Sequence, residues 1–117
     1  MKVGFTGTRN GMSVSQRRQL QAVCYALRTM REFHHGDAIG ADKQAAAFVA
    51  TARGVEVVPH PAGDDPLARN RRIVEACDIL IAAPETDREV VRSGTWATVR
   101  YARAAEKPVI HLSRGRR

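Results

Sequence analysis

The sequence of 117 residues contains few aromatic side chains and no long apolar run. Aromatic residues make up 5% of the chain, so the stacking platforms typical of single-strand nucleic-acid binders have little material. No stretch approaches the roughly 18–20 apolar residues of a membrane span. Residues 1–7 lack the apolar core and the small-residue cleavage site of a signal peptide. We therefore expect a cytoplasmic protein that does not bind membranes.

Cysteine and histidine are also scarce, with two and four residues. Cys24 falls within a helical pattern and Cys77 directly before an apolar run, positions typical of small core residues in a reducing compartment. His34 and His35 have no partner at metal-ligand spacing, so packing or solvent contact is the favoured role for both. We expect no disulfide, no metal site and no resident cofactor.

Acidic residues are outnumbered, with 12 Asp and Glu against 19 Lys and Arg and a formal net charge of +7. Many arginines stand singly on predicted helix faces, which favours a solvated basic surface. The alternative is an anionic partner, either a phosphate-bearing ligand or a polynucleotide. Residues 114–117 carry three arginines and are predicted to form a short basic tail after a single domain over residues 1–113.

Five short apolar runs alternate with helical patterns along the chain. Strands are expected at residues 2–6, 32–35, 55–58, 78–83 and 109–112. Helices are expected from Ser13 to about 30, over 42–53, from the end of a loop over 62–70 to about 77, and over 95–105. Ser13 and Gln16 form a Ser-x-x-Gln capping box, and Gly54 is a natural stop for the second helix.

This alternation predicts an α/β fold in which right-handed crossover units build a doubly wound parallel sheet, with helices on both faces. The run over 78–83 is the most apolar, so we place that strand at the centre of the sheet.

Glycines, hydroxyls and arginines gather where the predicted strands end, and ligands of doubly wound sheets bind beyond those ends. Glycine lets the backbone approach a phosphate closely, and helix N-termini offer unpaired N–H groups to anions. Arg9 and Arg69 are suited to clamp a phosphate bidentately. The residues expected to bind a ligand are Gly7, Thr8, Arg9, Gly36, Ala38, Gly40, Asp42, Arg69, Asn70, Ser93, Gly94 and Thr95.

Each of these features also has a purely structural interpretation. Any one glycine-rich loop is explained by the needs of a turn. Asp42 either accepts a ribose hydroxyl or caps the second helix. Trp96 either packs its helix onto the sheet or stacks on a base. The case for a site depends on several such loops meeting at one end of the sheet.

The loop motifs resemble those of the SLOG superfamily, which joins the DNA-processing protein A (Smf) fold with the Lonely Guy phosphoribohydrolases. The matching segments are residues 6–9 (TGTR), 35–42 (HGDAIGAD), 69–70 (RN) and 92–96 (RSGTW). The closest resemblance is to small single-domain, YspA-like SLOG proteins, and it covers nearly the whole chain. It implies a Rossmann-like sheet in the order 3-2-1-4-5, a nucleotide ligand at the predicted site, and a homodimer.

One departure from the Lonely Guy pattern bears on chemistry. These enzymes cleave the N-glycosidic bond between a base and ribose 5′-monophosphate, using an Arg and the Glu of a Pro-Gly-Gly-x-Gly-Thr-x-x-Glu motif. Arg69 matches that Arg and residues 94–95 match the Gly-Thr, but Thr98 stands in the place of the Glu. A threonine cannot stabilise an oxocarbenium-like sugar as a carboxylate does, so the sequence favours binding over hydrolysis.

Three functions follow in order of preference. The first is a module that senses, carries or sequesters a nucleotide or nucleotide-derived ligand. The second is an N-glycosidase with Arg69 as a catalytic residue and a carboxylate from the loop that carries Glu85, Asp87 and Glu89, although these acids also suit plain solvation of the loop. The third is binding of single-stranded DNA, which the resemblance to DNA-processing protein A and the basic charge suggest.

Overall fold

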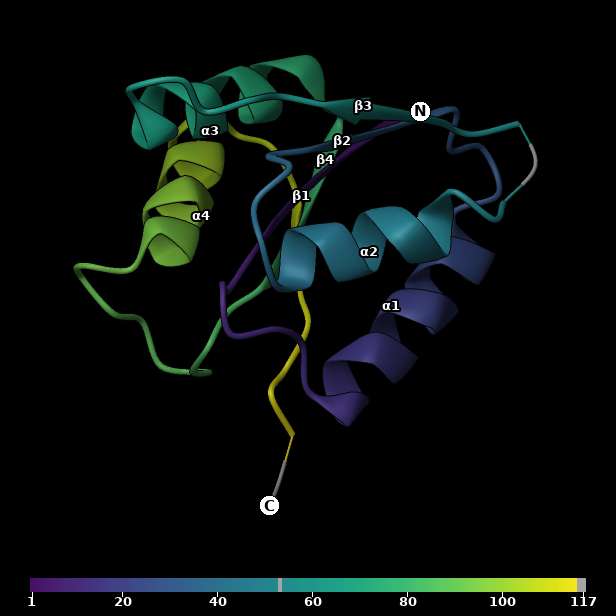
Figure 1. Ribbon diagram of the computed structural model, residues 1–117, viewed down its shortest axis with the longest axis horizontal. Helices are drawn as coiled ribbons and strands as arrows, with labels where there is room; N and C mark the ends of the chain where they lie inside the picture. The colour runs from purple at the N-terminus through teal and green to yellow at the C-terminus, as the bar shows by residue number, and fades with distance from the viewer. Residues whose placement is uncertain (53, 116–117) are drawn as a thin grey trace.

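The computed structural model describes residues 1–52 and 54–115, which form a five-stranded parallel sheet with helices on both faces (Figure 1). The elements are β1 (Lys2–Gly7), α1 (Val14–Ala26), β2 (Glu32–His35), α2 (Ala41–Val49), β3 (Glu56–Pro59), α3 (Pro66–Ala76), β4 (Ile79–Ala83), α4 (Gly94–Ala104) and β5 (Val109–His111). The strand order is β3-β2-β1-β4-β5, with every neighbouring pair parallel. The α/β fold and this order are as predicted.

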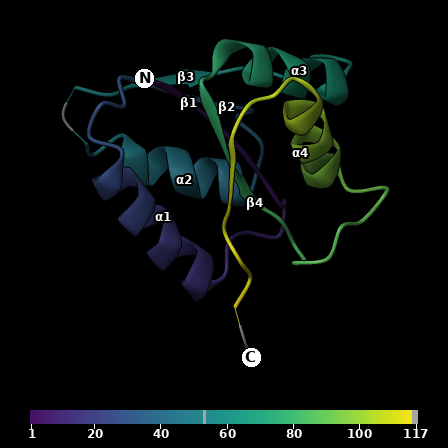
Figure 2. The ribbon, with the colours of Figure 1, turned by 180° about the vertical axis from the view of Figure 1, so that it is seen from behind.

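The helices divide between the two faces of the sheet as the strand order requires. Helices α1 and α2 lie on one face, and α3 and α4 lie on the other (Figures 1 and 2). The direction in which strands are added reverses between β1 and β4. β2 and β3 are added on one side of β1, and β4 and β5 are added on its other side. Loops that follow β1 and β4 therefore diverge, which opens a crevice at their carboxyl ends.

The predicted central place of the most apolar strand was wrong by one position. The centre of the sheet is β1, and β4 lies between β1 and β5. β1 looks less apolar because it includes Gly4, where a Cβ would lie 2.9 Å from the Sγ of Cys77. The close packing of the end of α3 therefore requires a glycine at the centre of the sheet.

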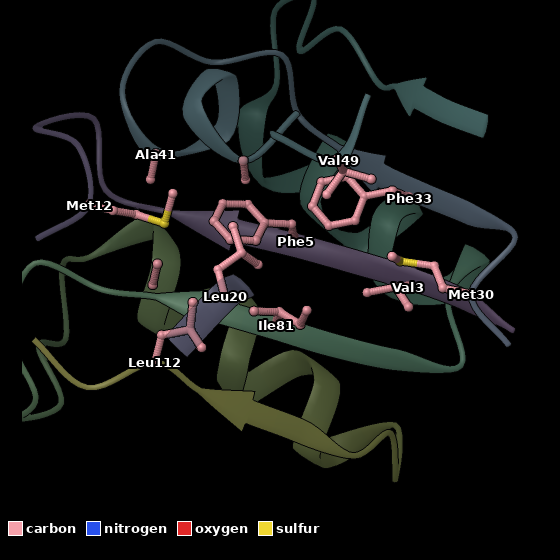
Figure 3. Packing of buried hydrophobic residues seen from close by; sticks show 12 residues of the cluster. Val3, Phe5, Met12, Leu20, Met30, Phe33, Ala41, Val49, Ile81 and Leu112 are labelled. Atoms are coloured by element: carbon pink, nitrogen blue, oxygen red, sulfur yellow. The ribbon is translucent and has the colours of Figure 1, made fainter. Parts of the chain in front are cut away.

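The larger core cluster fills the space between the sheet and α1–α2 (Figure 3). The rings of Phe5 and Phe33 lie 5.8 Å apart between centroids and are fully buried. The same cluster includes Leu20 from α1, Val49 from α2 and Ile81 from β4. A smaller cluster packs α3 and α4 on the opposite face.

The capping box of α1 is confirmed. The Ser13 hydroxyl accepts a hydrogen bond from the Gln16 backbone N–H at 3.0 Å, and the Gln16 side chain accepts one from the Ser13 N–H. α1 ends at Ala26, earlier than the predicted end near residue 30, because a turn follows in which Met30 donates to the carbonyl of Leu27. The side chain of Met30 remains buried, so the apolar pattern continues beyond the helix.

α3 begins earlier than predicted, so Arg69 and Asn70 lie in a helix and not in a loop. Asp65 is the N-cap, and its carboxylate accepts a hydrogen bond from the Ala68 N–H at 3.0 Å. Pro66 occupies the first helical position, which its fixed φ suits. An Asp-Pro pair at a helix start is a signal that sequence reasoning missed.

Both cysteines are free thiols, and burial raises their pKa values, that of Cys24 to about 11. Cys77 is buried and Cys24 is half-buried. No helix in the described part of the chain is long and apolar enough to cross a membrane. The second predicted helix extended to residue 53, which lies outside the described residues, but the observed α2 already ends at Val49.

Candidate functional site

A cavity of about 410 Å³ opens at the carboxyl ends of the strands, between the loops after β1, β2, β3 and β4. Its lining residues are Thr6, Gly7, Thr8, Arg9, Ala38, Asp42, Pro66, Leu67, Arg69, Asn70, Glu85, Ser93, Gly94 and Thr95. All the residues predicted to bind a ligand line this cavity, except Gly36 and Gly40. We call it the strand-end pocket.

Thr8 holds the loop after β1 in place. Its backbone N–H donates to the carbonyl of Ala83 at 3.0 Å, and its hydroxyl donates to Oε2 of Glu85 at 2.9 Å. A Cβ at Gly7 would lie 2.6 Å from the Cβ of Ala41. The glycine at position 7 is thus required by the approach of α2, whatever the pocket binds.

Gly40 has the same kind of role at the start of α2. Its φ is +84°, and a Cβ would lie 2.2 Å from the carbonyl oxygen of Arg9. The neighbouring N–H of Ala41 donates to the carbonyl of Thr8 at 2.9 Å. Gly40 therefore lets the loops after β1 and β2 approach each other closely, and it does not line the pocket.

Asp42 is not the cap of α2, so the capping interpretation is wrong. The N-cap is Gly40, and Asp42 lies in the first turn, where 5% of its surface is exposed. Its carboxylate accepts a hydrogen bond from the Gly36 N–H at 2.9 Å. Burial raises the pKa of Asp42 to about 6, although hydrogen bonds from Gly36 and Ala38 and the charge of Arg69 oppose the change.

Arg69 reaches from α3 into the same loop. Its Nη1 donates to the carbonyls of Gly36 and of His60, and its Nε donates to Oδ1 of Asn70 at 2.6 Å. A Cβ at Gly36 would collide with this guanidinium, which explains the glycine. Within the described residues Nη2 forms no hydrogen bond, and the side chain lines the pocket while only 7% exposed.

The N-terminus of α4 forms another wall. Ser93 is the N-cap and accepts a hydrogen bond from the Trp96 N–H at 3.2 Å. A Cβ at Gly94 would meet nothing within 4 Å, and its φ is not in the left-handed region. Gly94 is therefore a pocket glycine that neither packing nor backbone conformation explains.

Glu85 alone of the three acids in its loop lines the pocket. Asp87 lies 3.3 Å from Nε2 of His111, and Glu89 lies 2.8 Å from Nη1 of Arg100. Glu85 instead accepts the Thr8 hydroxyl. The sequence offered these acids as alternatives, and only the loop conformation distinguishes them.

The predicted basic tail is attached to this end of the molecule through Arg114. Its Nη1 donates to the carbonyl of Gly11 at 3.0 Å and to the side chain of Gln16 at 3.1 Å, and it lies 3.8 Å from Oε2 of Glu85. Its backbone N–H donates to Asp87 at 2.7 Å. Residues 116–117 of the predicted tail lie outside the described residues.

Thr98 and Trp96 are buried and do not line the pocket. The Thr98 hydroxyl donates to the carbonyl of Gly94 within α4 at 2.8 Å. Trp96 packs against Ala82 and Val99, so the packing interpretation of this residue is confirmed.

A chain of polar contacts that joins β2 to the residue after β3 was not predicted from the sequence. The two histidines His34 and His60 share a hydrogen bond of 2.8 Å, and Nε2 of His34 lies 2.8 Å from Glu32. Burial lowers the pKa of His60 and of His35. The spacing of Glu32 and His34 along one strand face was a possible signal, but the contact with His60 depends on the pairing of β2 with β3.

Comparison with protein-family models finds no match, and comparison with curated proteins finds none. Among solved structures the chain is similar to DNA processing protein A from Helicobacter pylori, described for its single-stranded DNA binding mode. The TM-score is 0.65 at 19% sequence identity, over 95% of this chain and 64% of that chain. At this level of sequence identity the likeness shows the fold alone. The chain thus spans less than two thirds of the solved protein.

Proposed function

We propose that the strand-end pocket binds a phosphate-bearing nucleotide or nucleotide-derived ligand. The observation that carries the proposal is that the N-terminus of α4, the Arg69 guanidinium and the Thr8 loop border one cavity. A volume of about 410 Å³ lies within the range of small-molecule sites, which run from roughly 300 to 1,000 Å³.

The lining divides into groups that suit different parts of a nucleotide. The first-turn N–H groups of α4 and the positive end of its dipole favour an anion beside Gly94 and Thr95. Arg9 and Arg69 add positive charge to the same cavity. The carboxylates of Asp42 and Glu85 accept hydrogen bonds and suit sugar hydroxyls.

A binding screen tests this assignment. Thermal shift and calorimetry would use nucleoside mono- and diphosphates, ADP-ribose and nucleotide sugars, with chromatography of every mixture afterwards. A ligand of the native state raises the melting temperature by mass action. We expect Arg9→Ala to weaken ligand binding by about tenfold, because Arg9 is exposed and lines the pocket. Arg18→Ala, at an exposed position on α1, should leave ligand binding unchanged. The proposal fails if no member of the panel binds or if both variants behave alike.

Single-stranded DNA is the second candidate ligand, and the likeness to DNA processing protein A supports it. The formal net charge of +7 adds an attraction to polyphosphates. A labelled oligonucleotide should then bind with an affinity that falls steeply with salt, because phosphate contacts release counterions. Binding that does not change with salt, or that is absent, would reject DNA while leaving the small ligand standing.

Hydrolysis of the ligand is the remaining alternative, and the chromatography decides it. Glu85 lines the pocket, and under this alternative it would supply the carboxylate that position 98 lacks. Release of free base and sugar phosphate would assign an N-glycosidase, with Arg69 binding the substrate's phosphate. Recovery of the intact ligand would assign a sensor or carrier.

A further inference from the structure

A second concave region lies between α1 and α2. One cavity of about 480 Å³ and another of about 260 Å³ lie next to each other, because Gln21 and Phe48 line both of them. Together they are lined by Met12, Arg17, Leu20, Gln21, Cys24, Tyr25, Leu27, Arg28, Met30, Arg31, Gln44, Phe48, Val49, Thr51, Ala52 and Val55. We call this the α1–α2 groove.

The groove is separate from the strand-end pocket. Figure 1 shows α1 and α2 converging at their C-terminal ends, and the larger cavity lies there. Arg31 and Val55, which line it, directly precede β2 and β3, so this end lies near the amino ends of the strands. The two cavities share no lining residue with the strand-end pocket.

The floor of the groove is apolar. Leu20, Met30 and Val49 belong to the main core cluster and form the base. Two aromatic side chains stand at the edge, where 77% of Tyr25 and 37% of Phe48 are exposed. Apolar surface with a polar rim and aromatic side chains is typical of sites that bind other proteins.

The rim of the groove carries charge of one sign. Arg17, Arg28 and Arg31 line it, and none of the lining residues is acidic. α1 contains no Asp or Glu over its whole length. The guanidinium of Arg28 lies 5.7 Å from the centre of the Tyr25 ring, which keeps positive charge beside the exposed aromatic.

From this combination we infer that the α1–α2 groove binds an amphipathic helix of a partner protein, with an apolar face and acidic flanks. A helix in a groove places its apolar side chains at i, i+3, i+4 and i+7, and complementary charge at the rim favours the correct partner. α1 has 13 residues, so the groove accommodates a helix of about three to four turns, roughly 20 Å.

The same observations disfavour two other occupants. A second copy of this chain facing the groove through the same surface would bring arginine rims together, which costs free energy. A nucleic acid would satisfy the arginines but would leave the apolar floor against a charged backbone. An amphipathic helix with acidic flanks would cover the floor with its apolar face and pair its carboxylates with the arginines of the rim.

The test uses a fluorescein-labelled synthetic helix of about 16 residues, with leucines on one face and glutamates along both flanks. One control peptide replaces the glutamates with lysines, and another has the same composition in scrambled order. We expect the chain to bind the glutamate helix at least about tenfold more tightly than either control. A triple variant with Arg17→Glu, Arg28→Glu and Arg31→Glu has a rim of the opposite charge. This variant should bind the lysine helix more tightly than the glutamate helix.

Matched variants separate the groove from general charge. Tyr25→Ser should weaken the binding of the glutamate helix, because the Tyr25 side chain is exposed at the edge of the groove. Arg103→Glu, an exposed change on α4 on the opposite face, should not alter binding. Melting temperatures within a few degrees of the unchanged protein confirm that each variant is folded.

Several results would overturn the inference. Equal binding of the helical and scrambled peptides would show that the groove does not recognise a helix. A triple variant that still prefers the glutamate helix would show that the charge of the rim does not select the partner. Displacement of the peptide by a single-stranded oligonucleotide would assign the groove to nucleic acid. A dimer in sedimentation that Tyr25→Ser dissociates would assign it to a second copy.

Discussion

Gly94→Ala separates the stability of the fold from the function of the strand-end pocket. The added Cβ would meet no atom within 4 Å, and the φ of Gly94 is not in the left-handed region. Alanine is favoured over glycine in helices by about 0.5–1 kcal/mol, because glycine loses more conformational freedom on folding. The free energy of unfolding should therefore stay constant or rise by up to about 1 kcal/mol, which corresponds to roughly 3–5 °C in Tm.

The same methyl group should weaken the binding of the proposed ligand. It would project from the first turn of α4, where the N–H groups of a helix must approach an anion closely. We expect calorimetry to show an affinity for the nucleotide reduced by about tenfold, in a protein at least as stable as the original.

Gly7→Ala is the matched control, because its Cβ would lie 2.6 Å from the Cβ of Ala41. A displacement of α2 should then lower stability by about 1–3 kcal/mol. The reasoning fails if Gly94→Ala destabilises the fold as Gly7→Ala does, or if it leaves nucleotide affinity unchanged.

Three further perturbations test the buried structure. The pKa of Asp42 lies at about 6, against 3.8 ordinarily, so its contribution to stability is complete below about pH 4 and is lost as pH rises to about 6. That difference in pKa corresponds to about 3 kcal/mol, so the free energy of unfolding from urea titrations should decline between those pH values. Asp42→Asn should remove most of this decline, and an equal decline in the variant would contradict the prediction. Gly40→Ala should lower Tm strongly, since its Cβ would lie 2.2 Å from the Arg9 carbonyl at a φ of +84°, and an unaltered Tm would disprove the contact. Phe33→Ala should cost about 3–5 kcal/mol in chemical denaturation, and a loss below 1 kcal/mol would mean that the core closes around the gap.

Local signals in the sequence account for most of the fold. The alternation of apolar runs and helical patterns predicted the parallel sheet, and Ser13 with Gln16 predicted the start of α1. The strand order came from the resemblance of the loop motifs and is confirmed. The start of α3 was wrong because Asp65 and Pro66 were assigned to a loop, although together they form an N-cap and a first helical residue.

The sequence predicted where the residues of the candidate site meet, but it did not predict the packing role of three of its glycines. Gly7, Gly36 and Gly40 were expected to admit a ligand, and the structure shows that each also accommodates another part of the protein. Their neighbours come from distant segments, so no local pattern identifies them. The selection of Glu85 over the other acids of its loop depends likewise on contacts that only the folded chain forms.

The contacts of Arg114 have a consequence for how the protein is made. The loop after β1 is among the first segments to be synthesised, yet the carbonyl of Gly11 accepts its hydrogen bond from a residue 103 positions later. The α1–α2 side of the sheet also waits for late segments, because Ile81 from β4 and Leu112 belong to its core cluster. On the ribosome, the loop beside the strand-end pocket should therefore gain this hydrogen bond only after residue 114 has left the exit tunnel.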